Sequence, residues 1–378
     1  MQILLGVGRR VLYLIPVLFI VSLGTFLMLD LVPGDPVVHI LGPDATPEQM
    51  AAVRLELGLD QPLVPRYFDW LFGVLQGDFG RSLLPPVEDV SEMLARRFPV
   101  TLELAIVAMV LSLAFSTLVA LVAVYRAGRR FDKASNVLAL VVLSTPSFLI
   151  ALLLVFFLVF RPGMVKWAIL GVGLATVAWL VYRALVKTRD LSRGERRGQL
   201  ALGLGVAAAV AVATVVLWQV WPAFPRQGFA RLGDGGGLWN HLEHLFLPAV
   251  TLALVEGAVF ARVLRNDLGS TLKEDFVLFA RAKGMPGRRV LLSDALRPSS
   301  FTLITVAGVS FGRLLGGTII VETIFNLPGM GTMIVRAVGA GDFRVVQAGV
   351  LVIAVFYVVI NSLIDISYSY LDPRVRRG

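Results

Sequence analysis

Apolar stretches long enough to cross a lipid bilayer recur along the whole chain. A soluble protein of 378 residues would be expected to form two or three domains, but a helix of about 20 apolar residues has the length that crosses the hydrocarbon layer. Together with 57% hydrophobic residues and a mean hydropathy of +0.79, these stretches predict an all-α polytopic membrane protein with about eight transmembrane helices. We expect the spans near residues 11–30, 101–124, 134–160, 164–186, 199–220, 246–264, 300–320 and 346–368.

Basic residues gather in short clusters between the apolar stretches. The formal net charge is +9, but the clusters do not follow one face of the chain, so no nucleic-acid partner is expected. With a cytoplasmic N-terminus, five basic segments fall on the cytoplasmic side, as the positive-inside rule favours. They are "GRR", "YRAGRRFDK", "RALVKTRDLSRGERRG", the stretch 274–298 and "DPRVRRG". Arg161 and Lys166 fall on the outer side and argue mildly against this orientation.

Residues 31–99 form one large insertion after the first span, on the outer side of the membrane. Within it, "ATPEQMAAVRLELGLD" has Thr46 as a helix N-cap, Pro47 at the first helical position and Gln49 completing a capping box. We therefore expect a folded extracytoplasmic segment with a short helix, and a structural cap is its simplest role.

Several kinds of chemistry have no support in the sequence. The chain has no cysteine, which excludes disulfides and thiolate metal sites, and we find neither a nucleotide-binding P-loop nor a GxSxG nucleophile elbow. His241 and His244 have a spacing that suits a metal, but no third ligand is evident. We expect no catalytic residue and no metal site.

A charged island, "EDFVLFARAKGMPGRRVLLSDALRP", interrupts the apolar sequence between two spans. Leu272 to Lys283 reads as an amphipathic helix, Gly284 falls where a left-handed residue ends a helix, and Pro286 can open a second helix. Small side chains at Ala280 and Ala282 would let a partner approach closely. A coupling device beneath the membrane and an ordinary amphipathic interfacial loop both fit these residues.

Sequence motifs along the chain resemble one transporter family. "ARAKG" followed by "ALRP" is similar to the EAA coupling motif of binding-protein-dependent ABC importer permeases. In chain order, "LVPGDP", "LGPDATPEQMAAVRLELGLDQPL", "GDFGRSL", "TLELA", "STPSF", "LPAVTLAL", "VETIFNLPGMG" and "LDPRVR" resemble the dipeptide/oligopeptide branch. The EAA opening stands here as Ala280, Arg281 and Ala282, and Pro298 falls one position later than the general pattern.

This resemblance implies a six-span importer core to which two further spans have been added. The expected segments are a first span at 1–30, the insertion at 31–99, core spans 2 and 3 at 100–160, an extra two-span insertion at 161–217 and the remaining core at 218–378. The coupling segment is then 265–298. The stretch 161–217 has no counterpart in the six-span design, so the resemblance implies nothing about its role.

The resemblance also implies a function and a set of partners. It suggests a channel-forming permease subunit, not an enzyme, in the bacterial cytoplasmic (inner) membrane with both termini cytoplasmic. Implied partners are a second permease subunit, two ATPase subunits that bind ATP and Mg²⁺, an extracytoplasmic solute-binding protein and a di- or oligopeptide substrate; the chain itself binds no cofactor. The alternatives are an importer of nickel chelates, glutathione or other small solutes, and a proton-driven secondary transporter.

Three sets of residues are candidates for function. The ATPase-coupling set implied by the resemblance is Ala280, Ala282, Gly284, Leu296 and Pro298. Glu256 and Arg313 lie mid-span, where an ionisable group facing lipid is costly, so they are expected to pair as structural glue or to line the pathway. Asn326, Pro328, Gly329 and Gly331 have the composition of a tight re-entrant turn at the outer mouth, which could act as a gate.

Overall fold

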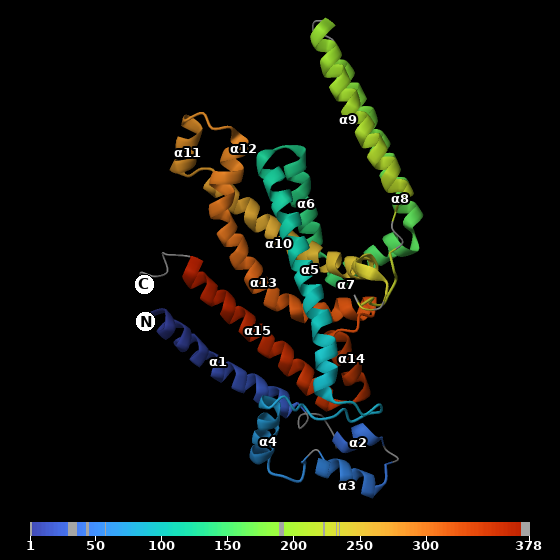
Figure 1. The fold of residues 1–378 in the computed structure, drawn as a ribbon, viewed down its shortest axis with the longest axis vertical. Coiled ribbons are helices and arrows are strands. Elements are labelled where there is room, and N and C mark those ends of the chain that lie inside the picture. The colour runs from blue at the N-terminus through green and yellow to red at the C-terminus, as the bar shows by residue number, and fades with distance from the viewer. Residues whose placement is uncertain are drawn as a thin grey trace. The chain divides into compact units, whose positions relative to one another are not determined.

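The computed structural model describes residues 2–28, 36–42, 45–56, 58–188, 193–221, 224–231, 233 and 235–371, and the regular elements within them are helices (Figure 1). The elements are α1 (Gln2–Leu27), α2 (Pro36–Leu41), α3 (Pro47–Glu56), α4 (Leu63–Leu75), α5 (Val90–Tyr125), α6 (Arg130–Ser144), α7 (Ser147–Leu154), the π-helical η1 (Val155–Phe160), α8 (Pro162–Lys187), α9 (Arg193–Gln219), α10 (Gly237–Thr271), α11 (Asp275–Ala282), α12 (Gly287–Arg289), the π-helical η2 (Val290–Ala295), α13 (Leu296–Phe325), α14 (Met330–Ala340) and α15 (Phe343–Leu371). The expected all-α class is confirmed.

Within those residues, six helices are long and apolar enough to cross a membrane, and a bent helix pair gives a seventh. Each of the expected spans coincides with a helix or with this pair, except that the first lies partly outside the described residues. The pair departs from the expected continuous span at 134–160, because α6 ends at Ser144 and a new helix begins after Pro146. A proline has no N–H for the helical ladder and clashes with the preceding turn, which explains the break.

The second span starts earlier than the sequence predicts. α5 begins at Val90 instead of residue 101, so the last residues of the expected insertion at 31–99 are its first turns. The Asp89 side chain accepts a hydrogen bond from the backbone N–H of Ser91 at 2.9 Å, which caps the helix there. The first turns of α5 carry polar residues, including Glu92 and Arg96. Hydropathy alone therefore placed the start of the second span later in the sequence.

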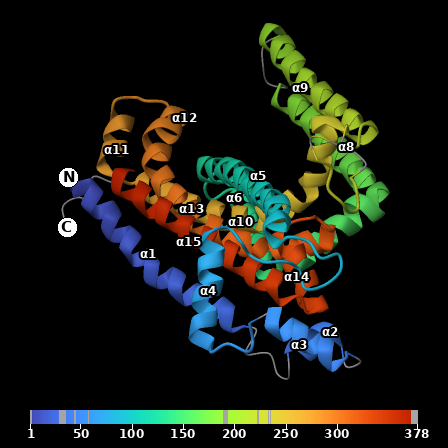
Figure 2. The ribbon, with the colours of Figure 1, turned by 60° about the horizontal axis from the view of Figure 1, so that its bottom comes forward.

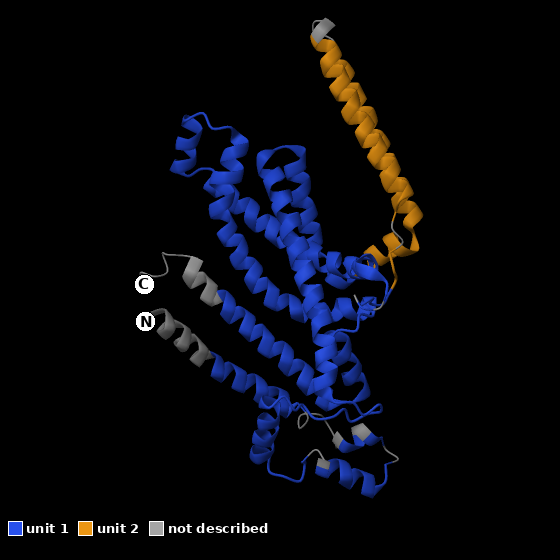
Figure 3. Cartoon of the chain, in the orientation of Figure 1, with its two compact units in different colours: residues 1–150, 227–378 blue, residues 151–226 orange. Residues whose placement is uncertain are grey.

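The chain divides into two compact units (Figure 3). The smaller unit, residues 151–226, contains α8 and α9 and includes the extra segment expected at 161–217. Its two long helices pack closely at two glycines. A Cβ added at Gly173 would lie 2.2 Å from the Thr214 side chain, and one added at Gly203 would lie 2.7 Å from Ala184. Small residues at such crossings let two helix backbones approach in a membrane.

The larger unit, residues 1–150 and 227–378, is built on α5, α10, α13 and α15. In one core cluster, α10 contributes Phe260, Leu264 and Leu268, which pack with Leu303 of α13. A second cluster joins the start of α5 to α14 and α15. Figures 1 and 2 show α11 and α12 at the end of this unit opposite to α2, α3 and α4.

The insertion is folded against the rest of the larger unit. The predicted capping box is confirmed, because the Thr46 N–H donates to Gln49 Oε1 at 3.0 Å and the Gln49 N–H donates to Thr46 Oγ1 at 3.3 Å. The Tyr67 hydroxyl of α4 lies 2.7 Å from Ser22 Oγ of α1, and both side chains are buried. These contacts fix α4 on the first span.

Candidate functional site

The charged island forms a helical hairpin whose turn depends on Gly284. α11 ends at Ala282, and Gly284 has φ of +77°, as predicted for a left-handed residue. The Gly284 N–H donates to Arg281 O at 2.9 Å and the Met285 N–H donates to Ala280 O at 3.3 Å. These two bonds are the Schellman pattern, which satisfies the last carbonyl groups of a helix.

The second arm of the hairpin runs directly into a membrane span. The helix opens after Pro286, continues through η2 and becomes α13, so it is one helical rod from Gly287 to Phe325 instead of a separate short helix. Leu296 and Pro298 lie in the first turn of α13. Because Pro298 has no N–H, it cannot extend the regular ladder, and the π-helical residues 290–295 lie just before it.

Ala280 and Ala282 lie on opposite sides of α11. Ala280 is buried with Val277 and Val290, so its small side chain lets the two arms of the hairpin approach each other. This differs from the expectation that it faces a partner. Ala282 is exposed, and the two alanines are therefore not one surface.

α11 exposes large apolar side chains beside the charged residues Asp275 and Arg281. The exposed fractions of Phe276, Leu278 and Phe279 are 51%, 51% and 62%, and Leu292 on the other arm is 56% exposed. Lys283 Nζ lies 4.5 Å from the Phe279 ring centroid. The name hairpin face is used below for five exposed residues, which are Phe276, Leu278, Phe279, Ala282 and Leu292. Large apolar side chains gathered on a charged segment are typical of an interaction surface.

Glu256 of α10 and Arg313 of α13 are in contact. Arg313 Nη2 lies 3.2 Å from Glu256 Oε2 and 3.3 Å from Oε1, and it also donates to Ser310 Oγ at 3.2 Å. The burial of the pair is uneven, because the Glu256 side chain is 10% exposed and that of Arg313 is 65% exposed. Glu256 and Arg313 therefore form the ion pair that was one of the two expectations, and most of the Arg313 side chain is exposed.

The predicted tight turn at 326–331 joins α13 to α14. Asn326 ends α13 with φ of +49°, and the Leu327 N–H donates to Glu322 O at 2.9 Å. Gly329 and Gly331 are both buried. Pro328, which directly precedes Gly329, is half-buried.

A buried carboxylate organises this turn. Glu322 is fully buried; its Oε1 accepts from Thr101 Oγ1 at 2.6 Å and its Oε2 accepts from the Thr332 N–H at 3.1 Å. Thr101 Oγ1 also accepts from the Met330 N–H at 2.8 Å. Sequence reasoning did not single out Glu322, although an acidic residue near the end of an apolar span is the same signal that identified Glu256.

The two glycines of the turn leave room for Glu322. A Cβ at Gly329 would lie 2.4 Å from both Cδ and Oε2 of that carboxylate. A Cβ at Gly331 would lie 2.5 Å from the backbone Cα of Ile319. Neither glycine has the positive φ that only glycine adopts readily. Their role is therefore to let Glu322 and the backbone of Ile319 approach the turn closely.

The histidines considered as metal ligands are engaged otherwise. His241 Nδ1 lies 2.6 Å from Ala230 O and its Nε2 lies 2.6 Å from Glu103 Oε1, so both ring nitrogens are occupied. His244 Nδ1 lies 2.8 Å from Asn240 O of its own helix.

Comparisons with known proteins place this geometry in context. A family model described as "binding-protein-dependent transport system inner membrane component" matches residues 112–377, and a model for the N-terminal part of such membrane components matches residues 3–105. A protein of Brucella abortus strain 2308, named as a peptide transport system permease, is 33% identical over 368 residues, which cover 97% of this chain and 98% of the relative. The dipeptide transport system permease protein DppB of Escherichia coli K12 is 31% identical over 369 residues, which cover 97% of each chain.

Adding one methyl group at Gly331 should destabilise the protein. Because the new Cβ would meet helix backbone, we expect Gly331→Ala to lower the stability by about 1–3 kcal/mol. Gly339→Ala is the matched control, since a Cβ at Gly339 in α14 meets nothing within 4 Å. Thermal unfolding of both purified variants measures the difference, and equal melting temperatures would contradict the close approach.

Removing either charge of the pair should have unequal effects. Arg313→Gln leaves the Glu256 carboxylate buried without its cation, which costs about 1–3 kcal/mol, whereas Glu256→Gln leaves a largely exposed arginine and should cost less. The double neutral variant should be more stable than the sum of the two single effects predicts. A double-mutant cycle on thermal stability tests this, and strict additivity would mean that the two residues do not interact.

Proposed function

The chain belongs to the family of binding-protein-dependent transport system inner membrane components, and on that premise we propose that it is the channel-forming subunit of an ATP-driven importer for di- or oligopeptides. Peptides are the proposed cargo because both relatives compared above are named as peptide or dipeptide permeases. As a permease subunit it carries no catalytic role of its own, and hydrolysis belongs to partner subunits.

The observation that carries this proposal is the apolar hairpin face on a segment continuous with a membrane span. We propose that an ATPase subunit docks there, where Phe276, Leu278 and Phe279 would lose exposed apolar area on binding. Ala282, Gly284, Leu296 and Pro298 shape or support this surface, and Ala280 holds its two arms together.

A single helix connects all three sets of candidate residues. α13 begins with Leu296 and Pro298, carries Arg313 at its middle and ends at Asn326. Its 30 residues span about 45 Å at 1.5 Å per residue. A push on the hairpin by closing ATPase subunits would therefore tilt one rod and move the charged pair and the turn together, exchanging inward-open and outward-open states.

The remaining partners follow from the same proposal. A second permease subunit would complete the pathway, two ATPase subunits would bind ATP and Mg²⁺, and an extracytoplasmic binding protein would deliver the peptide. The hairpin end of the larger unit is cytoplasmic in this scheme, and the end that carries α2, α3 and α4 faces the binding protein. Glu256 and Arg313 then lie along the pathway, where the outward-facing guanidinium can contact cargo.

Uptake by the reconstituted complex tests the proposed function. With the second permease, the ATPases and the binding protein in proteoliposomes, we expect labelled dialanine to accumulate only when ATP and Mg²⁺ are supplied. A nickel chelate and glutathione, offered as competitors, should not reduce this uptake. Accumulation driven by a proton gradient without ATP would contradict the proposal, and competition by either solute would replace peptides as the cargo.

Replacing Gly284 with valine should uncouple hydrolysis from transport. A β-branched residue at φ of +77° is strained by about 1–3 kcal/mol, so the turn is expected to shift and misplace the hairpin face. The measurement is the amount of dialanine taken up per ATP hydrolysed, which should fall severalfold. Gly287→Val is the matched control, because its Cβ also meets nothing within 4 Å and its φ is not positive. Normal coupling in Gly284→Val, with ATPase subunits still bound, would show that the hairpin is not the docking site.

A further inference from the structure

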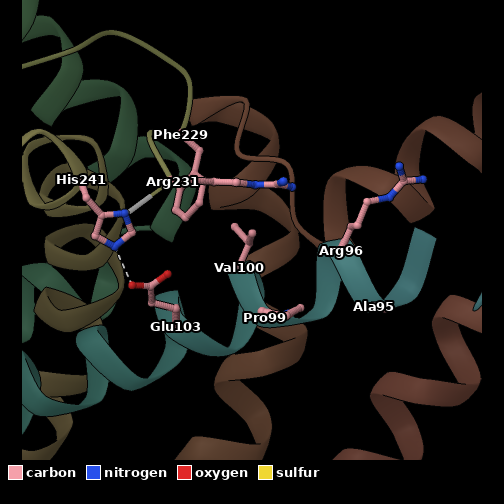
Figure 4. Close-up of a pocket in the computed structure, with 8 residues that line it drawn as sticks. All are labelled: Ala95, Arg96, Pro99, Val100, Glu103, Phe229, Arg231 and His241. Carbon is pink, nitrogen blue, oxygen red and sulfur yellow. Dashed lines mark hydrogen bonds and ion pairs between the residues drawn. The ribbon is translucent and has the colours of Figure 1, made fainter. Parts of the chain in front are cut away.

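A pocket of about 360 Å³ lies in the larger unit, beside the contact between His241 and Glu103 (Figure 4). One face of α5 forms its floor, where Arg96, Pro99, Val100 and Glu103 follow one another at the helical spacing that puts side chains on one side. Its size is near the lower end of the range for small-molecule sites. This pocket is distinct from the hairpin face and from the turn at 326–331.

The opposite wall is an irregular segment that is fixed at three successive residues. The Gly228 N–H donates to Phe325 O at 3.0 Å, the Phe229 ring packs edge-on against the His241 ring at 5.3 Å between centroids, and Ala230 O contacts His241 Nδ1. The next residue is Arg231, which also lines the pocket. Its backbone position is therefore set by contacts that do not involve its own side chain.

Charges of both signs lie at defined positions around the pocket. Glu103 is oriented by the buried His241, which occupies Oε1, and the described residues place no hydrogen bond on its Oε2. Arg96 lies seven residues earlier on α5, a rise of about 10 Å, and it is ion-paired with Glu88 on the exposed surface. Figure 4 shows the Arg231 side chain extending away from His241 and Glu103, so the guanidinium groups and the carboxylate lie at different ends.

The floor of the pocket also offers a backbone acceptor. Pro99 has no N–H, so the carbonyl of Ala95 loses the donor that a regular helix would provide four residues later. Both residues line the pocket. A carbonyl group released from the helical ladder can accept a hydrogen bond from a ligand amide.

From this arrangement we propose that the pocket binds a short peptide with both termini free, with the ammonium group at Glu103, the carboxylate at Arg231 and Arg96, and a backbone N–H near Ala95. An extended dipeptide or tripeptide spans about 7–10 Å, which fits the separation of the charges along α5. Val100 and Phe229 supply apolar surface for side chains. This inference rests on the proposed function and deepens it, because it assigns this chain a part in recognising the cargo.

Binding of three related peptides to the reconstituted complex without its binding protein tests the proposal. The probes are dialanine, N-acetyl-dialanine and dialanine amide, titrated by saturation-transfer NMR on the complex in lipid nanodiscs. Wild-type protein should bind dialanine about tenfold more tightly than either blocked peptide, because each block removes one charge-assisted contact. Equal affinity for all three peptides, or binding of none, overturns the proposal.

The variants assign each terminus to a residue. Arg231→Gln should remove the preference for dialanine over its amide and keep the preference over the acetylated peptide, while Arg231→Lys should restore most of the first preference. Glu103→Gln should remove the preference for dialanine over the acetylated peptide and keep the preference over the amide. Arg161→Gln, which removes one positive charge outside the pocket, should change neither preference. If Arg231→Gln retains both preferences, the pocket does not bind the carboxylate.

The proposed function and this inference can fail separately. Loss of discrimination between the peptides, with ATP-dependent uptake intact, overturns only the pocket. Peptide binding that follows the predicted preferences, without ATP-dependent uptake, overturns the transport proposal and leaves the pocket.

Discussion

The rest of the structure depends on the requirement that backbone polar groups be satisfied without water inside a membrane. Helices meet it locally, which is why every regular element among the described residues is helical. Where α13 gives way to α14, the ladder stops and side chains must replace it. Glu322 and Thr101 do so, since they bind the backbone N–H groups of Thr332 and Met330. A buried carboxylate is costly, and these contacts offset that cost.

Proline and glycine mark the other places where regular helix is interrupted. Pro146 separates α6 from α7, Pro298 follows a π-helical stretch, and Gly284 turns the hairpin through a left-handed residue. The cause is a missing N–H at the two prolines and a positive φ at Gly284. The outcome differs with position: at Pro298 the rod continues into the span, whereas at Pro146 the chain changes direction.

The proposed mechanism follows from the continuity of α13. A hairpin joined to the span by a flexible link could bind a partner without moving anything else. Here the second arm of the hairpin is the first part of the same rod, and Val277 and Ala280 pack α11 onto Val290 of that rod. Force applied to the exposed apolar face is thus transmitted to the helix that carries Arg313 and ends at the turn beside Glu322.

The sequence by itself determined the all-helical membrane class, the capping box at Thr46 and the left-handed turn at Gly284, because these depend on local spacing and on single residue types. It also singled out Glu256 and Arg313 as charges inside apolar spans, where a pair or a place along the pathway was expected. Only the tertiary structure decided that Ala280 faces inward, that Glu322 holds the turn and that Glu103 meets His241. The members of each contact with Glu322 or Glu103 come from different helices, and their distance in space depends on how those helices pack, which no local pattern encodes.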